Sequence, residues 1–284
     1  MDYAPDLSAY FVRVGYGATA APTLACLNAI VRAHVESIPF ENLDVLLGRP
    51  IDLDPAAVED KLVHRGRGGY CFEQNSLLAH MLTAMGFTVT PLSARVRLGR
   101  ERSMTPPRTH MCLRVDLEGE RWLVDVGVGA LSLTSALRLD TDAVQPTPHE
   151  PRRLVRDGAW QGQDLRGPQA RVFHQVNLGN GWEDVCDMTL EPMPQIDQEL
   201  GNWYTSAHPR SHFRNRLMAA RATPEGRISL LNRTLKVRAA DGKSKAQTVQ
   251  SPSELLKVLH THFGLEFSAE VRFPCDGLDW STQD

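Results

Sequence analysis

The spacing of apolar positions divides the chain into a helical beginning and a β-rich middle. Up to about residue 88, apolar residues recur every three or four positions, which is typical of helices that bury one face. Three stretches carry this pattern, namely 22–40, 54–64 and 71–86. We expect Pro22 in the first turn of the first helix and Asp54 as the N-cap of the second. The third helix should end at Gly86.

From about Val89 the apolar period shortens to two, the period of a half-buried strand. The alternation predicts short strands within 91–98, 153–160 and 173–188. Asp157-Gly158 and Asn180-Gly181 predict hairpin turns in the last two of these segments. Several short strands with such turns indicate an antiparallel barrel or sandwich.

The last third of the chain mixes the two patterns. Segment 226–243 has the alternation of a strand pair, and 251–264 has the signals of a helix. In that helix Ser251 is the expected N-cap, Glu254 completes a capping box and Gly264 ends the last turn. The sequence thus predicts an α+β protein with a helical region at 1–88, a β region at 89–200 and an α/β region at 201–284.

A predicted hairpin over residues 110–129 brings a histidine and an aspartate to one face. With Glu118-Gly119 as a two-residue turn, Cys112 lies opposite Asp125. His110 and Asp125 then become diagonal neighbours, with Cα atoms roughly 7–8 Å apart. One additional loop residue would invert the parity of the strand and separate the two side chains.

A cysteine stands between the glycine pair at 68–69 and the third predicted helix. Cys71 would therefore lie at a helix N-terminus, where the helix dipole and the free N–H groups favour a thiolate. A reactive thiol needs a base, and the base needs a group that orients it. Cys71, His110 and Asp125 together predict such a nucleophile, base and orienting carboxylate.

Other interpretations of these residues stay open at this point. Each of the three could be structural: a packed thiol, a hydrogen-bonded strand histidine and a carboxylate that caps a turn. A metal site from Cys71, His110 and Cys112 is disfavoured, because no two ligands have the spacing usual for zinc. The spacing also leaves open whether an acyl group would pass to water, an amine or another thiol.

The composition excludes several classes of protein. Apolar residues make up 42% of the chain and charged residues 23%, and 31 Lys and Arg balance 34 Asp and Glu without long runs. We therefore expect no nucleic-acid surface and no polybasic membrane patch. No secretory signal or membrane-length apolar run is seen, and five scattered cysteines favour reduced thiols in a cytoplasm. No CxxC, HExxH or phosphate-loop pattern indicates a bound metal or nucleotide.

Several blocks of the sequence resemble the arylamine N-acetyltransferases of bacteria. They follow one another in the family's order over nearly the whole chain, and the block around Cys71 is the most specific. These blocks are AYFVRVGYGATAAPTL (9–24), IPFENLDVLL (38–47), RGGYCFEQN (67–75), PPRTHMCLRV (106–115), WLVDVGVG (122–129) and GNWYTSAHPRSHFRNRLMAAR (201–221).

The resemblance implies a helical bundle, a β-barrel and a C-terminal α/β lid around a catalytic core like that of cysteine proteases. It implies transfer of acetyl from acetyl-CoA to an arylamine or arylhydrazine nitrogen, or to the oxygen of an N-hydroxyarylamine. The transfer would be ping-pong, with Cys71 as nucleophile, His110 as base and Asp125 as orienting group. No permanently bound cofactor and no metal is implied, and the protein would be a monomer or homodimer.

The same resemblance suggests residues that contact the substrates. For the acceptor pocket they are Phe40 and Phe72. The family usually has DVGFG where this chain has DVGVG, so that Val128 replaces an aromatic ring of that pocket. For CoA the candidates are Thr109, Gly127, Gly129, Trp203, Thr205, Ser206 and Phe213.

Three other functions stay open beside this one. A related amide synthase would close a polyketide thioester onto an aryl amine. A cysteine hydrolase or transglutaminase-like enzyme shares the Cys-His-Asp order, but the CGSCW block of papain-like enzymes is absent. A binding protein with a vestigial site is disfavoured by the intact set of three residues.

Overall fold

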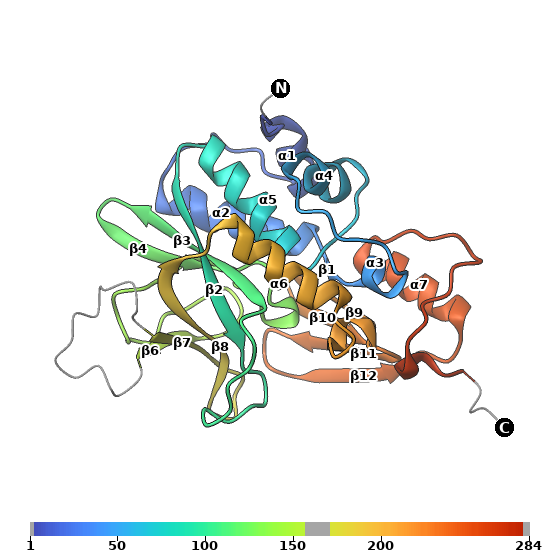
Figure 1. Cartoon of the computed structure of the whole chain (residues 1–284). Coiled ribbons are helices and arrows are strands. Elements are labelled where there is room, and N and C mark those ends of the chain that lie inside the picture. Colours follow the sequence, from blue (N-terminus) through green and yellow to red (C-terminus); the bar gives the residue numbers. More distant parts are fainter. Residues whose placement is uncertain (1–2, 157–170, 281–284) are drawn as a thin grey trace.

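The computed structural model describes residues 3–156 and 171–280. In Figure 1 the N-terminal helices lie at the top, a curved sheet at the left, and a second sheet with α7 at the right. Helix α6 crosses the middle, between the two sheets. The predicted hairpin turn at Asp157-Gly158 lies outside the described residues.

The three predicted helical stretches of the N-terminal region are confirmed. Asp54 caps its helix as expected, because its carboxylate accepts the N–H of Ala56 at 3.0 Å. The helices of this region are α1 (Leu7–Val14), α2 (Leu24–Ser37), α3 (Leu43–Leu46), α4 (Pro55–Glu59), the π-helical turn η1 (Asp60–His64) and α5 (Cys71–Ala84).

One helix start differs from the prediction. Pro22 stands before α2 rather than in its first turn, because Thr23 is the N-cap. The Thr23 hydroxyl accepts the N–H of Cys26 at 3.2 Å, and this satisfies one of the free donors at the helix start.

The larger sheet has seven antiparallel strands in the order β5-β4-β3-β2-β8-β7-β6. It curves until its two edge strands approach each other, and Gln145 joins them. The backbone of Gln145 pairs with Arg152 of β6, and its side-chain carbonyl accepts the N–H of Arg138 in β5 at 2.7 Å. The strands are β2 (Thr88–Val96), β3 (His110–Leu117), β4 (Glu120–Val124), β5 (Leu137–Arg138), β6 (Arg152–Arg156), β7 (Arg171–Asn177) and β8 (Trp182–Pro192).

The smaller sheet joins the two ends of the chain. Its order is β1-β9-β10-β11-β12, so that β1 from the N-terminal region pairs with β9. Ser251 and Gly264 bound α7 as predicted. The remaining elements are β1 (Phe40–Glu41), α6 (Gln195–Ala207), β9 (Met218–Thr223), β10 (Gly226–Leu231), β11 (Thr234–Ala239), β12 (Ser244–Thr248), α7 (Pro252–Phe263) and the 3₁₀ turns η2 (Gly129–Leu131), η4 (His212–Arg214) and η5 (Asp276–Leu278).

The register of the central hairpin is as predicted. Leu113 pairs with Val124, and the turn residues Glu118 and Gly119 both have positive φ, at 53° and 79°. This is the backbone of a two-residue type I′ turn. The hairpin of β7 and β8 is also present, although Asn177 pairs with Trp182 and the loop between them therefore has four residues.

None of the helices among the described residues combines the length and the apolar character that a membrane crossing needs.

The cap of α2 makes a prediction. Replacement Thr23→Ala should lower the free energy of unfolding by about 1 kcal/mol, because the N–H of Cys26 loses its partner. Pro22→Ala is the matched control and should change stability little. Urea denaturation of both variants measures the difference, and equal losses would contradict the assignment of Thr23 as the cap.

Candidate active site

The turn before α5 places Cys71 as the first residue of that helix. The turn needs glycine at both of its central positions for lack of space. A Cβ at Gly68 would collide with the carbonyl oxygen of Pro39, and one at Gly69 would come within 2.7 Å of the Glu73 carboxylate. The predicted placement of the thiol at a helix N-terminus is therefore confirmed, and backbone packing enforces it.

A cluster of buried charged side chains packs against this turn. The Glu73 carboxylate accepts the N–H of Tyr70 at 3.0 Å and caps α5. Lys61 donates to Glu73 at 2.6 Å and to Asp44 at 2.8 Å, while Arg67 lies 3.3 Å from Asp44. Burial alone would raise the pKa of Asp44, but these cations hold it at about 2. The turn is thus held by largely buried ion pairs.

His110 and Asp125 form a buried imidazole–carboxylate pair. Nε2 of His110 donates to Oδ2 of Asp125 at 2.7 Å, and neither residue is more than 2% exposed. Strand β4 ends at Val124, so Asp125 is free to turn toward the start of β3. The diagonal approach predicted from the hairpin register is therefore realised at hydrogen-bond distance.

Asn75 holds the carboxylate of this pair from the other side. Its amide nitrogen donates to Oδ1 of Asp125 at 3.2 Å, and its oxygen accepts the N–H of Val126 at 3.2 Å. Sequence reasoning did not assign this residue a role. The available signal was its position four residues after Cys71, on the same face of the helix.

The third member of the set, Cys71, approaches the same pair. Burial would lower the pKa of His110, but the Asp125 charge and hydrogen bonds to Asp125 and Cys71 raise it to about 10. The thiol lies 3.7 Å from the carbonyl oxygen of Thr109. Cys71, His110 and Asp125 thus come together from α5, β3 and the segment after β4.

Gly127 lets these elements approach each other. A Cβ at this position would lie 2.6 Å from the Cα of Cys71 and 2.6 Å from the amide nitrogen of Asn75. This packing explains the glycine without a ligand. The predicted contact of Gly127 with CoA stays a prediction.

A cavity of about 620 Å³ lies near the thiol, because Thr109, whose carbonyl oxygen is 3.7 Å from the Cys71 sulfur, is among its lining residues, whereas Cys71 is not. Thr109 lines it on one side, and Leu200, Gly201 and Tyr204 of α6 line it on the other. The remaining lining residues are Ser93, Pro107, Arg108, Glu191, Pro192, Met193, Pro194 and Asp197.

Helix α6 contacts both residues that flank Cys71, namely Tyr70 and Phe72. The Tyr70 hydroxyl donates to the side-chain oxygen of Asn202. A Cβ at Gly201 would come within 2.5 Å of the Phe72 ring, so glycine allows α6 to lie on that ring. One wall of the cavity is in this way held against the two residues that flank Cys71.

Phe40 and Phe213, two of the predicted contact residues, form an aromatic wall next to Tyr70, the residue before Cys71. The ring of Phe213 lies 6.3 Å from that of Phe40 and 5.5 Å from that of Tyr70. A Cβ at Gly129 would touch Phe40 at 3.5 Å. Phe40, Phe213 and Gly129 are therefore neighbours, and their contacts with substrates stay predictions.

The other predicted contact residues have different surroundings. Val128 is buried in the interior of the seven-stranded sheet. Trp203 is 57% exposed on α6. The hydroxyls of Thr205 and Ser206 donate to carbonyls of their own helix at 2.8 Å, which is the ordinary bond of such residues inside a helix.

A metal could be sought among His110, Asp125 and Cys186, whose ligand atoms lie within 4.8 Å of one another. Two ligands at about 2.0–2.1 Å from a tetrahedral zinc ion are separated by roughly 3.3 Å. The 2.7 Å between His110 and Asp125 is shorter and fits a shared proton instead. The geometry therefore favours proton transfer chemistry.

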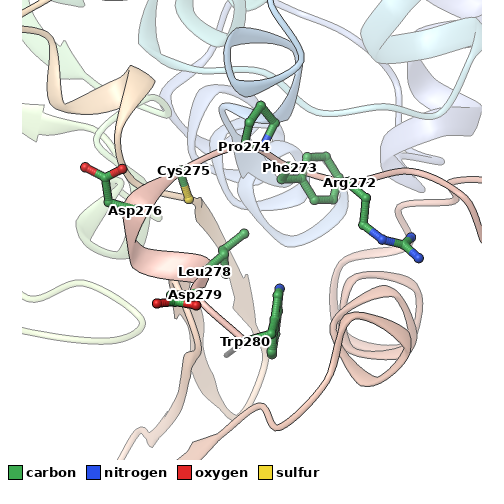
Figure 2. A pocket seen from close by; sticks show the side chains of 8 residues that line it. All are labelled: Arg272, Phe273, Pro274, Cys275, Asp276, Leu278, Asp279 and Trp280. Carbon is green, nitrogen blue, oxygen red and sulfur yellow. The ribbon is translucent and has the colours of Figure 1, made fainter. Parts of the chain in front are cut away.

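A second cavity, of about 460 Å³, lies at the C-terminal segment (Figure 2). It shares no lining residue with the cavity beside Cys71. Its lining residues are Arg272, Phe273, Pro274, Cys275, Asp276, Leu278, Asp279 and Trp280.

Residues 23–272 match a family model described as N-acetyltransferase. The arylamine N-acetyltransferase of Mycolicibacterium smegmatis is 42% identical over 267 residues, which is 93% of each chain. The chain belongs to the arylamine N-acetyltransferase family. A member from Salmonella typhimurium, named arylamine N-acetyltransferase / N-hydroxyarylamine O-acetyltransferase, is 38% identical, and the match covers 91% of this chain and 88% of the relative.

The fold agrees with this assignment. The structure of the Mycobacterium marinum arylamine N-acetyltransferase in complex with CoA is 38% identical in sequence and superposes with a TM-score of 0.83. The match covers 91% of this chain and 92% of that one. The combination of helices with a nearly closed seven-stranded sheet is therefore that of the family.

The raised pKa of His110 makes a prediction for stability against pH. The pKa of His110 in the folded protein, about 10, exceeds the ordinary value of 6.5. The protonated imidazole therefore stabilises the folded protein fully below about pH 6.5. This stabilisation is lost as the pH rises through about 10. The stability difference between the native protein and His110→Gln should therefore shrink between pH 6.5 and 10. Urea denaturation at several pH values measures it, and a difference that grows with pH would contradict the assignment.

Proposed function

We propose that this protein transfers acetyl from acetyl-CoA to the nitrogen of arylamines and arylhydrazines, and to the oxygen of N-hydroxyarylamines. The observation that carries the proposal is the buried His110–Asp125 pair beside Cys71 at the first turn of α5. The names of the M. smegmatis and S. typhimurium relatives and the CoA bound in the M. marinum structure support the same activity.

The first half-reaction forms a thioester on the protein. His110 holds the proton of Cys71, and the thiolate sulfur attacks the carbonyl carbon of acetyl-CoA. The bond between that carbon and the sulfur of CoA then breaks, and CoA leaves with the proton that His110 returns. Asp125 keeps the imidazole in place and stabilises its charged form. Acetyl-Cys71 and free CoA result.

The second half-reaction releases the acetyl group to the acceptor. The amine nitrogen attacks the carbonyl carbon of acetyl-Cys71, and the neutral His110 accepts the proton of the amine. The carbon–sulfur bond breaks, and the proton passes back to Cys71. A backbone N–H at the start of α5, such as that of Cys71, would stabilise the oxyanion in both halves.

CoA and the acceptor would meet at the cavity beside the thiol. Thr109 lines this cavity, which supports its proposed contact with CoA. The aromatic wall of Phe40 and Phe213 offers a surface for an aryl ring. We further propose CoA contacts at Gly127, Gly129, Trp203, Thr205, Ser206 and Phe213, and acceptor contacts at Phe72 and Val128.

We further propose the features that the resemblance implied for the whole protein. The catalytic core would resemble that of cysteine proteases, and residues 201–284 would act as a lid over regions 1–88 and 89–200. The protein would act in the cytoplasm as a monomer or homodimer, with acetyl-CoA as co-substrate and without a permanently bound cofactor.

Brief mixing with acetyl-CoA in the absence of amine tests the covalent intermediate. The intact mass of the native protein should rise by about 42 Da, one acetyl group, and an added arylamine should remove it. Cys71→Ala should gain no mass, and Cys112→Ala, the matched control, should behave like the native protein. If native protein neither gains mass nor releases CoA, acetyl-CoA is not the donor.

The missing ring at Val128 makes a prediction about acceptor preference. Val128→Phe should strengthen aryl stacking by about 0.5–1.5 kcal/mol and change the ranking of aniline and hydrazine acceptors. Val128→Ile, which adds bulk without a ring, is the control. The comparison is kcat/KM for a series of acceptors, and an unchanged ranking would remove Val128 from the acceptor pocket.

A further inference from the structure

A chain of buried polar side chains runs from β10 toward the His110–Asp125 pair. It begins at Arg227, whose guanidinium donates to both carboxylate oxygens of Glu150 at 2.8 Å. Glu150 also accepts from Arg152 at 3.0 Å, and Nη1 of Arg152 lies 3.1 Å from Nε2 of His174. None of these four side chains belongs to the catalytic set, and each residue is at most 5% exposed.

The direction of the hydrogen bonds along this chain is fixed. A guanidinium can only donate, so Nε2 of His174 accepts and the ring proton sits on Nδ1. Burial and the charge of Arg152 keep the pKa of His174 well below its ordinary value, so the ring is neutral. Because β7 pairs His174 with Cys186 of β8, the Nδ1–H group faces the Cys186 sulfur at 3.9 Å.

Cys186 completes the connection to the active site. It is fully buried, and its sulfur lies within 4.8 Å of a ring nitrogen of His110 and a carboxylate oxygen of Asp125. Burial and the charge of Asp125 raise the pKa of this thiol well above its ordinary value, so it keeps its proton. Because the sulfur faces the N–H of His174, its own S–H dipole can point toward the Asp125 carboxylate, whose oxygen lies within 4.8 Å.

The far end of the chain carries net positive charge. The single carboxylate of Glu150 is paired with three guanidinium groups, those of Arg152, Arg227 and Arg238.

The other charged and titratable groups near Cys186 already have partners or belong to the site. Asp187 pairs with the buried Arg97, and Asp184 pairs with the partly exposed Arg102. Cys71 belongs to the site, and Cys112 of β3 has its sulfur at the Leu92 carbonyl and the Met188 sulfur. The Glu150 cluster is therefore the positive charge that acts on Asp125 through His174 and Cys186.

We propose that Cys186 and His174 are positioning residues for acetyl transfer, which orient the Asp125 carboxylate and weaken the hold of His110 on its proton. This inference rests on the proposed function. On acetyl-Cys71 the imidazole must be neutral to accept the proton of the amine. Without the S–H at Asp125 the carboxylate would bind the imidazolium more strongly, and amine transfer would slow at neutral pH.

The first experiment titrates His110 itself and does not depend on the acetyl chemistry. Histidine-ring NMR spectra are followed against pH in Cys71→Ala protein, and the His110 signal is the one lost in His110→Gln. Adding Cys186→Ala should raise the pKa of His110 by about half a unit, because one weak donor to the carboxylate is lost. Cys186→Ser restores a donor and should bring the value back.

Cys112→Ala is the matched control for the loss of a buried thiol. Cys112 lies in the same interior, but its sulfur contacts the Leu92 carbonyl at 3.9 Å and the Met188 sulfur at 3.8 Å. It should leave the titration of His110 unchanged. An unchanged titration in Cys186→Ala, or the same shift in both alanine variants, would overturn the inference. If Cys186→Ala does not fold, Cys186→Val fills the space without a donor and takes its place.

The second experiment links the titration to the reaction. Acetyl-Cys71 protein is prepared and mixed with an arylamine, and the rate of deacetylation is followed against pH. The acidic limb of this profile should move to higher pH in Cys186→Ala by the same half unit and return in Cys186→Ser. If acetyl-Cys71 never forms, the proposed function is wrong, while the NMR result on His110 remains valid. If acetyl-Cys71 forms but the acidic limb of the pH profile does not move in Cys186→Ala, only the positioning role is wrong.

Discussion

The active site depends on the close contact between the start of α5 and the turn that follows β4. The Cα of Cys71 and the amide of Asn75 lie so near Gly127 that no side chain fits between them. This contact brings a helix N-terminus against a carboxylate at the end of a strand. Asn75 then bridges the two elements by bonding both Asp125 and the N–H of Val126. Any separation of helix and sheet would break these bonds together with the alignment of the nucleophile and its base.

Buried charge holds the contact from two sides. Behind α5, Lys61 ties Glu73 to Asp44 and fixes the glycine turn. On the side of the sheet, Glu150 forms ion pairs with three arginines, and one of them, Arg152, donates to His174. Such groups cost desolvation and gain stability only when each is paired, so they specify one arrangement of the chain. Helix α6 adds a third constraint, because Tyr70 and Gly201 fasten it to the residues beside Cys71.

Local patterns predicted the parts of this structure that depend on neighbouring residues. The turn at Glu118 and Gly119 determines the parity of its hairpin, and parity alone brought His110 and Asp125 to one face. Pro22 precedes α2 instead of lying in its first turn, because Pro22 and Thr23 both suit a helix start and the Thr23 hydroxyl forms the cap hydrogen bond. The contacts that join distant segments of the chain could not be predicted from local patterns. Asn75 and Cys186 approach Asp125 across 50 and more positions of sequence, and although Asn75 shares a helix face with Cys71, no local pattern shows that either residue comes to Asp125.

The central claim is that His110 activates Cys71. The most direct test measures the rate at which iodoacetamide alkylates Cys71 at pH 7, by mass analysis of its peptide, in the native protein and in His110→Gln. The account predicts that the rate falls by at least about tenfold in His110→Gln, because the thiol loses the group that takes its proton. Equal rates in the two proteins would show that the thiol reacts without His110 and would contradict the account.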